Sequence, residues 1–116
     1  MHPELFGNVI SQSGSYGWYP PSAGQEYQFR GIDPDSGWLL KLIAEAPRKP
    51  IRFHLDTGIW EGNMMIFSNR MLRSVLAGKG YDVVYNESDG THSSYYWMLR
   101  LPDGLLWTLA KSDRDR

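Results

Sequence analysis

The sequence predicts an α/β fold, with a mainly parallel sheet of about three strands flanked by helices. Two observations lead to this prediction. β-rich segments alternate along the chain with segments whose apolar residues recur at helical spacing. Strands joined through helices run parallel, because right-handed βαβ crossovers return the chain in the same direction. The 116 residues fit a single domain, 1–116, that is large enough to bury a usable core.

The first half of the chain predicts a strand, a long loop and a helix. Residues 8–14 (NVISQSG) indicate a short buried strand that continues into a loop. Residues 15–35 are rich in Gly, Pro, Ser and aromatic side chains, which is typical of a functional loop of roughly 20 residues. Ser36 can then N-cap a helix that ends at Pro47. The apolar residues expected on one face of that helix are Trp38, Leu39, Leu42 and Ile43.

The second half predicts two further strands and two further helices. Residues 51–58 alternate apolar and polar side chains, as a strand with one well-buried face does. The next helix carries apolar residues at helical spacing: Met64, Phe67, Met71, Val75 and Leu76. Residues 81–88 form the third β-rich segment. After a turn, residues 95–111 predict a final helix that is interrupted by Pro102 and Gly104.

Composition excludes several classes of function. The formal net charge of −1 leaves no basic stripe for nucleic acid, and the absence of cysteine excludes thiolate catalysis and Cys-based zinc sites. The histidines share no metal-ligand spacing, so neither a metal nor another cofactor is expected. No apolar run approaches the ~20 residues that span a bilayer. Residues 1–9 lack the features of a signal peptide, and a cytoplasmic location is the default expectation.

Polar side chains follow each predicted strand, and these positions are where parallel sheets collect reactive groups. A serine cluster lies in 11–18, a carboxylate in 56–61 and a histidine, His92, in 88–94. Together they have the composition of a nucleophile, acid and base. The order of carboxylate before histidine is the one that α/β-hydrolases use.

No G-x-S-x-G motif for the nucleophile of such an enzyme occurs in the chain. Ser11, Ser13 and Ser15 precede a proline-containing loop instead of a helix, so they are expected to satisfy backbone groups at a strand end. For the acid, both Asp56 and Glu61 are candidates. A carboxylate in the first turn of a helix, such as Glu61, also has a structural explanation in the helix dipole.

Aromatic side chains gather near these loops, and they either line a binding cleft or cap the core. The residues that we consider for substrate binding are Tyr16, Trp18, Tyr19, Trp60 and Trp97. His54 alternates with an apolar face and is expected to be a packed strand residue.

Three segments together resemble the C-terminal half of an esterase family. They are HPELFGNVISQSGS (2–15), DTGIWEGNMMIFSNRMLRSVLAGKGYDVVYNESDGTH (56–92) and the W…LPDGLLWTL pattern (97–109). The family comprises the enterochelin (ferric-siderophore) esterases, and feruloyl esterases and mycolyltransferases are its relatives. The resemblance covers nearly the whole chain.

The resemblance implies an α/β-hydrolase fold and an ester substrate, either a siderophore or another acyl ester. It implies that His92 is the catalytic base and that Glu61 occupies the acidic position. Thr91 and Ser93 depart from the G-G-H-D pattern that is usual in the family. The family's serine lies in G-x-S-x-G-G before the H-P-E-x-F-G segment, so we expect it upstream of Met1.

A chain without that serine is expected to be a partial α/β-hydrolase that is inactive by itself. It would serve as part of a serine ester hydrolase together with a complementary N-terminal segment. The alternative hypothesis is a non-catalytic remnant that acts as an oligomeric or binding module, because the edges of a thin sheet favour pairing between chains.

Overall fold

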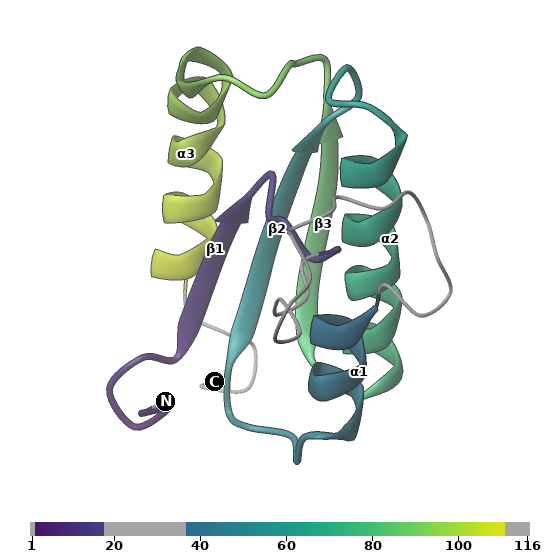
Figure 1. Cartoon of the computed structure of the whole chain (residues 1–116). Coiled ribbons are helices and arrows are strands. Elements are labelled where there is room, and N and C mark those ends of the chain that lie inside the picture. The colour runs from purple at the N-terminus through teal and green to yellow at the C-terminus, as the bar shows by residue number, and fades with distance from the viewer. Residues whose placement is uncertain (1, 18–36, 111–116) are drawn as a thin grey trace.

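Three parallel strands form one sheet in the order β1-β2-β3, as predicted. The computed structural model describes residues 2–17 and 37–110 (Figure 1). The elements in chain order are β1 (Asn8–Gln12), α1 (Trp38–Glu45), β2 (Arg52–Gly58), α2 (Asn63–Gly78), β3 (Asp82–Ser88) and α3 (Ser94–Leu109). The α/β class and the parallel sheet are therefore confirmed.

The register of the sheet brings the carboxyl ends of all the strands to one edge. Asp56 of β2 pairs with Gln12 of β1 on one side and with Asn86 of β3 on the other. The segments that follow β1, β2 and β3 therefore start beside one another in space. They are distant in the sequence: Ser13, which follows β1, and Gly58, which ends β2, are more than 40 residues apart.

Helices cover both faces of the sheet. Helices α1 and α2 lie on one face and α3 lies on the other (Figure 1). The hydrophobic core is on the α1/α2 side and consists of Leu40, Leu55, Leu72 and Leu76. The apolar face of the strand 51–58 is buried as expected, with Ile51 and Leu55 inside, but the opposite face is not exposed: α3 covers it, and His54 and Asp56 are both buried.

The α3 side of the sheet is polar and aromatic. The Arg52 guanidinium lies 4.2 Å from the centre of the Trp107 ring, and the Arg100 Nε lies 3.3 Å from Asp56 Oδ2. His54 is packed in the strand, as expected, and burial lowers its pKa. Its Nδ1 makes no hydrogen bond within the described part of the chain, whereas Asn86 Nδ2 lies 3.3 Å from its Nε2. Neutral histidine therefore suits this position.

The final helix is continuous from Ser94 to Leu109, so the predicted interruption at Pro102 and Gly104 is wrong. Pro102 is exposed and forfeits one hydrogen bond of the helix. Gly104 is buried, and a Cβ there would lie 3.0 Å from Ile10 and 3.3 Å from His54. The glycine allows the helix to approach the sheet closely.

The apolar faces of α1 and α2 agree with the predicted ones in part: Ile43 packs against the core and Leu76 belongs to it. In α1 the buried residue is Leu40, whereas Trp38 and Leu42 of the predicted stripe are exposed. The predicted cap, Ser36, lies outside the described residues, and Gly37 stands at the N-cap. The buried residues of α2 are Ser68, Asn69, Leu72 and Leu76. Phe67 and Met71 are exposed beside a hollow on the outer side of that helix.

Candidate functional site

The turn after β2 and the loop after β3 are bonded together through their backbones. Ile59 N–H donates to Ser88 O at 2.9 Å, and Trp60 N–H donates to Gly90 O at 3.0 Å. Gly58 permits this approach, because a Cβ at that position would lie 2.3 Å from the Gly90 oxygen. The two segments that carry Glu61 and His92 are thus held at a fixed separation.

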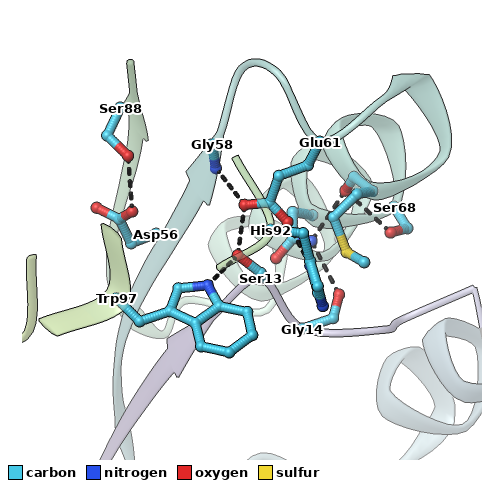
Figure 2. A network of polar contacts seen from close by, with 11 residues as sticks. Ser13, Gly14, Asp56, Gly58, Glu61, Ser68, Ser88, His92 and Trp97 are labelled. Carbon is cyan, nitrogen blue, oxygen red and sulfur yellow. Dashed lines mark hydrogen bonds and ion pairs between the residues drawn. The ribbon is translucent and has the colours of Figure 1, made fainter. Parts of the chain in front are cut away.

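Glu61 and His92 meet across these two segments. Glu61 Oε2 lies 2.7 Å from His92 Nδ1 (Figure 2). The Glu61 side chain is 1% exposed and the His92 side chain is 51% exposed. Since an ionised carboxylate only accepts hydrogen bonds, Nδ1 carries the proton in this contact. The second ring nitrogen, Nε2, is then an acceptor on the more exposed side of the pair, with no hydrogen bond to any residue in 2–17 or 37–110.

Two further donors hold the other oxygen of Glu61. The Gly58 N–H donates to Oε1 at 2.6 Å, and the Ser13 hydroxyl donates to it at 2.5 Å. The Trp97 indole N–H donates in turn to Ser13 Oγ at 2.9 Å (Figure 2). The Trp97 and His92 rings also form a T-shaped contact, with 4.9 Å between their centroids and an interplanar angle of 89°. Contributions from the ends of β1 and β2 and from α3 therefore converge on one carboxylate.

Asp56, the other candidate acid, lies away from His92. Strand alternation turns its side chain toward α3, where it accepts hydrogen bonds from Ser88 Oγ at 3.1 Å and from Arg100 Nε at 3.3 Å. The geometry thus selects Glu61 as the carboxylate that pairs with the histidine, a choice that the residues alone left open.

The predicted substrate-binding aromatic residues occupy different surroundings. Tyr16 packs against the core, its hydroxyl donates to Ser11 Oγ at 2.6 Å, and burial raises its pKa. Trp60 is exposed, and its indole N–H contacts Asp89. Trp18 and Tyr19 lie outside the described residues. Of the described members Tyr16, Trp60 and Trp97, it is Trp97 that contacts the His92 ring.

No hydrogen bond joins His92 to a serine side chain in residues 2–17 or 37–110. Ser13 donates its proton to Glu61, and Ser11 accepts from Tyr16.

Within residues 2–17 and 37–110, no group of side chains is arranged to hold a metal ion, and no helix is long and apolar enough to cross a membrane. The contact with Glu61 can orient the His92 imidazole through Nδ1.

Sequence reasoning missed the parts played by Gly58, Ser13 and the Trp97 indole. Gly58 and Ser13 hold Glu61 through hydrogen bonds that depend on loop geometry. One signal was present for Gly58, because a glycine at the end of a strand often marks a close backbone approach. Trp97 was expected to bind substrate, and its contact with Ser13 could not be foreseen from spacing.

Comparisons with known proteins agree with this geometry. The chain is 34% identical over 116 residues to the iron(III) enterobactin esterase of Escherichia coli, and 29% identical over 105 residues to the iron(III) salmochelin esterase of the same species. The crystal structure of the enterochelin esterase from Shigella flexneri superposes with a TM-score of 0.68 at 31% identity and covers 90% of the chain. A second Shigella flexneri structure, of an enterobactin esterase in the presence of 2,3-dihydroxy-N-benzoyl-glycine, gives a TM-score of 0.67 at 32% identity.

The chain is similar to part of the enterochelin esterases. The resemblance stated from the sequence motifs is confirmed. The match comprises 97% of the chain but 26% of the Escherichia coli enterobactin esterase, so the chain spans about a quarter of the length of this relative. The matched part is a C-terminal fragment, smaller than the C-terminal half expected from the motifs. A scan against protein-family profiles finds no match.

Proposed function

We propose that this chain supplies the acid and the base of a serine ester hydrolase. In this proposal Glu61 and His92 belong to a Ser-Glu-His triad whose serine lies on a segment outside these 116 residues. The observation that carries the proposal is the 2.7 Å contact between Glu61 Oε2 and His92 Nδ1. The absence of a G-x-S-x-G motif from the sequence is the reason to look for the serine elsewhere.

The contact supports the following chemistry. His92 Nε2 takes the proton of the serine hydroxyl while the serine oxygen attacks the ester carbonyl. The imidazolium that forms is stabilised by Glu61 and then gives its proton to the departing alcohol. Water, deprotonated by the same nitrogen, attacks the acyl-serine and releases the acid. Throughout, Glu61 stays ionised and keeps Nδ1 as the protonated nitrogen.

The burial of the two residues fits these roles. Glu61 is removed from water, with its side chain 1% exposed, so its attraction to an imidazolium is weakly screened. His92 is half exposed and is able to meet a group brought by another segment. A buried anion with several donors beside a more accessible imidazole is the arrangement that a triad requires.

The substrate class follows from the relatives. Their names describe esterases of iron(III) enterobactin and iron(III) salmochelin, which makes a siderophore ester the first substrate to test for this chain. Other acyl esters remain within the same chemistry, since the acid–base pair acts on the serine and the leaving alcohol and does not recognise the acyl group.

The experiment is a hydrolysis assay with p-nitrophenyl butyrate. The chain is tested alone and mixed with a segment of an enterochelin esterase that contains the serine. We expect hydrolysis above background only in the mixture, with loss in His92→Ala and in Glu61→Ala. The matched control is His2→Ala, because His2 is exposed and binds Glu4 at the far end of β1. Hydrolysis by the chain alone that is lost in His92→Ala would contradict a serine on another segment.

A second candidate function is an oligomeric or binding module without catalysis. Exposed apolar side chains on α3 favour it: Met98, Leu99, Leu105, Leu106 and Leu109. Size-exclusion chromatography with light scattering separates the two candidates. A stable oligomer that does not support hydrolysis with any serine-bearing segment supports the module, whereas a chain that becomes active in the mixture supports the triad.

A further inference from the structure

Ser13 has an unusual backbone conformation for a residue with a side chain. Its φ of 54° makes it the one non-glycine residue with positive φ in the described ranges 2–17 and 37–110. Glycine, asparagine and aspartate are the residues that usually tolerate this region. Ser13 is also buried, at 6% exposure. With this φ, Ser13 directs its hydroxyl differently from a serine in an extended backbone.

The hydrogen bonds of the Ser13 hydroxyl have a fixed direction. The Trp97 indole N–H is a donor only, so at 2.9 Å the Ser13 oxygen must accept from it. A serine hydroxyl has a single proton, and the other partner, Glu61 Oε1 at 2.5 Å, is an acceptor. The proton of Ser13 therefore points to Glu61. Trp97 thus donates to Ser13 and Ser13 donates to Glu61 Oε1, while the other oxygen of Glu61 accepts from His92 Nδ1.

The two oxygens of Glu61 consequently have different partners. Oε1 accepts from Ser13 and from the Gly58 backbone, whereas Oε2 faces His92 Nδ1. The backbone donor alone holds one point of the carboxylate and leaves rotation about the last side-chain bond. The Ser13 hydroxyl adds a second direction on the same oxygen, which fixes the plane of the carboxylate and directs Oε2 at the histidine.

We propose that Ser13 is a positioning residue for the acid–base pair, and that it acts by holding the Glu61 carboxylate so that His92 keeps its proton on Nδ1. This inference rests on the proposed function for its catalytic consequence, but its structural part concerns the histidine tautomer and is measurable in the chain by itself. Ser13 is thereby distinguished from a nucleophile, because its proton is committed to Glu61.

The experiment measures the tautomer of His92 in the ¹⁵N-labelled chain by long-range ¹H–¹⁵N correlation. His92→Gln assigns its signals among those of the three histidines. In Ser13→Ala and Ser13→Gly the ratio of the Nδ1–H to the Nε2–H form is expected to fall about tenfold. This is the change in an equilibrium constant that follows from the loss of one hydrogen bond to a charged group. Ser13→Gly accommodates the positive φ without strain, so it separates loss of the hydroxyl from a folding defect.

The matched control is Ser15→Ala, which removes an exposed hydroxyl two residues away and is expected to leave the ratio unchanged. Ser13→Cys keeps a weak donor at the same position and is expected to recover part of the ratio. A ratio within about twofold of the unsubstituted chain in both Ser13→Ala and Ser13→Gly overturns the inference, because one lost hydrogen bond to a charged group shifts it further.

Hydrolysis by the mixture with a serine-bearing segment separates this inference from the proposed function. There the Ser13 variants are expected to lower kcat about 10- to 100-fold with KM nearly unchanged, which is the loss of one charged hydrogen bond at the transition state. A tautomer shift without hydrolysis in any mixture upholds Ser13 as a positioning residue and refutes the esterase. Hydrolysis that requires His92 but is unaffected in both Ser13→Ala and Ser13→Gly upholds the esterase and overturns the role of Ser13.

Discussion

Replacing Gly58 by alanine is expected to separate the two segments that carry Glu61 and His92. The added Cβ would lie 2.3 Å from the Gly90 oxygen, 2.6 Å from the Gly90 carbonyl carbon and 2.9 Å from Glu61 Oε1. An ordinary contact begins at 3.4 Å, so the Gly90 oxygen must move by about 1 Å or β2 must shift by the same amount. Both closest atoms are backbone, and no side-chain rotation relieves the overlap.

The magnitude follows from that displacement. Overpacking of this kind lowers the free energy of unfolding by about 2 kcal/mol. Misplacement of a catalytic group by about 1 Å lowers the rate about 10²-fold. Gly58→Ala should therefore reduce both the stability of the chain and the hydrolysis that it supports in the presence of a serine-bearing segment.

Urea denaturation followed by tryptophan fluorescence measures the first effect, and the NMR signal of the His92 Nδ1 proton measures the second in the chain alone. Gly78→Ala is the control, because Gly78 ends α2 and a Cβ there meets nothing within 4 Å. We expect that control to be neutral or up to about 1 kcal/mol stabilising through helix propensity. A Gly58→Ala chain that is as stable as the unsubstituted one and keeps the His92 signal would refute the reasoning about the close approach.

Three further outcomes are expected. Glu61→Gln places an amide N–H against His92 Nδ1, favours the wrong tautomer and lowers kcat about 10⁴-fold in the assembled enzyme; NMR of the tautomer and p-nitrophenyl butyrate turnover test this, and an unchanged tautomer would contradict it. Burial lowers the pKa of His54 from 6.5, so the unfolded chain binds this proton at a higher pH than the folded one. Stability should be full above pH 6.5 and fall below it, by at most about 1.4 kcal/mol per pH unit, with a flatter profile in His54→Phe; equal slopes in the two chains would count against this. Leu72→Ala should cost about 2–5 kcal/mol and Met71→Ala under about 1 kcal/mol, because Leu72 is 2% and Met71 48% exposed; comparable losses in urea denaturation would place the core of α2 on the wrong face.

The order of elements and the location of the site were predictable because both depend on periodicity and on the geometry of parallel sheets. Alternation of β-rich and helical segments implied parallel strands, and parallel strands bring their carboxyl ends to one edge. From this rule the segments containing Ser13, Glu61 and His92 were expected to meet, and they do.

The choice between Asp56 and Glu61 depended on information that a single strand does not contain. Alternation places Asp56 opposite Leu55, but which of those faces α3 covers is a matter of tertiary packing. The same limitation explains why the predicted apolar stripe of α2 was right for Leu76 and wrong for Phe67 and Met71. Met71 and Leu72 are adjacent and both apolar, and only the position of the sheet determines that Leu72 is the buried one.

The continuity of α3 was missed for a local reason. Pro102 is a helix breaker on average, but it lies on the exposed side of this helix, where one lost hydrogen bond is tolerated. Gly104 lies on the side that contacts Ile10, where the absence of a side chain improves packing. Helix propensity alone could not show that Gly104 serves a close contact with the sheet and does not end the helix.

The most direct test of the account replaces the matched C-terminal quarter of the Escherichia coli enterobactin esterase with this chain. The chimera then carries the serine of the relative together with Glu61 and His92. The measurement is kcat/KM for ester hydrolysis by the chimera and by its His92→Ala variant. If Glu61 and His92 are the acid and base, the chimera turns over the ester and its His92→Ala variant loses at least about 10³-fold in kcat/KM. A folded chimera that is inactive, or one whose activity survives His92→Ala, would contradict the proposal that Glu61 and His92 are the acid and base of a serine esterase.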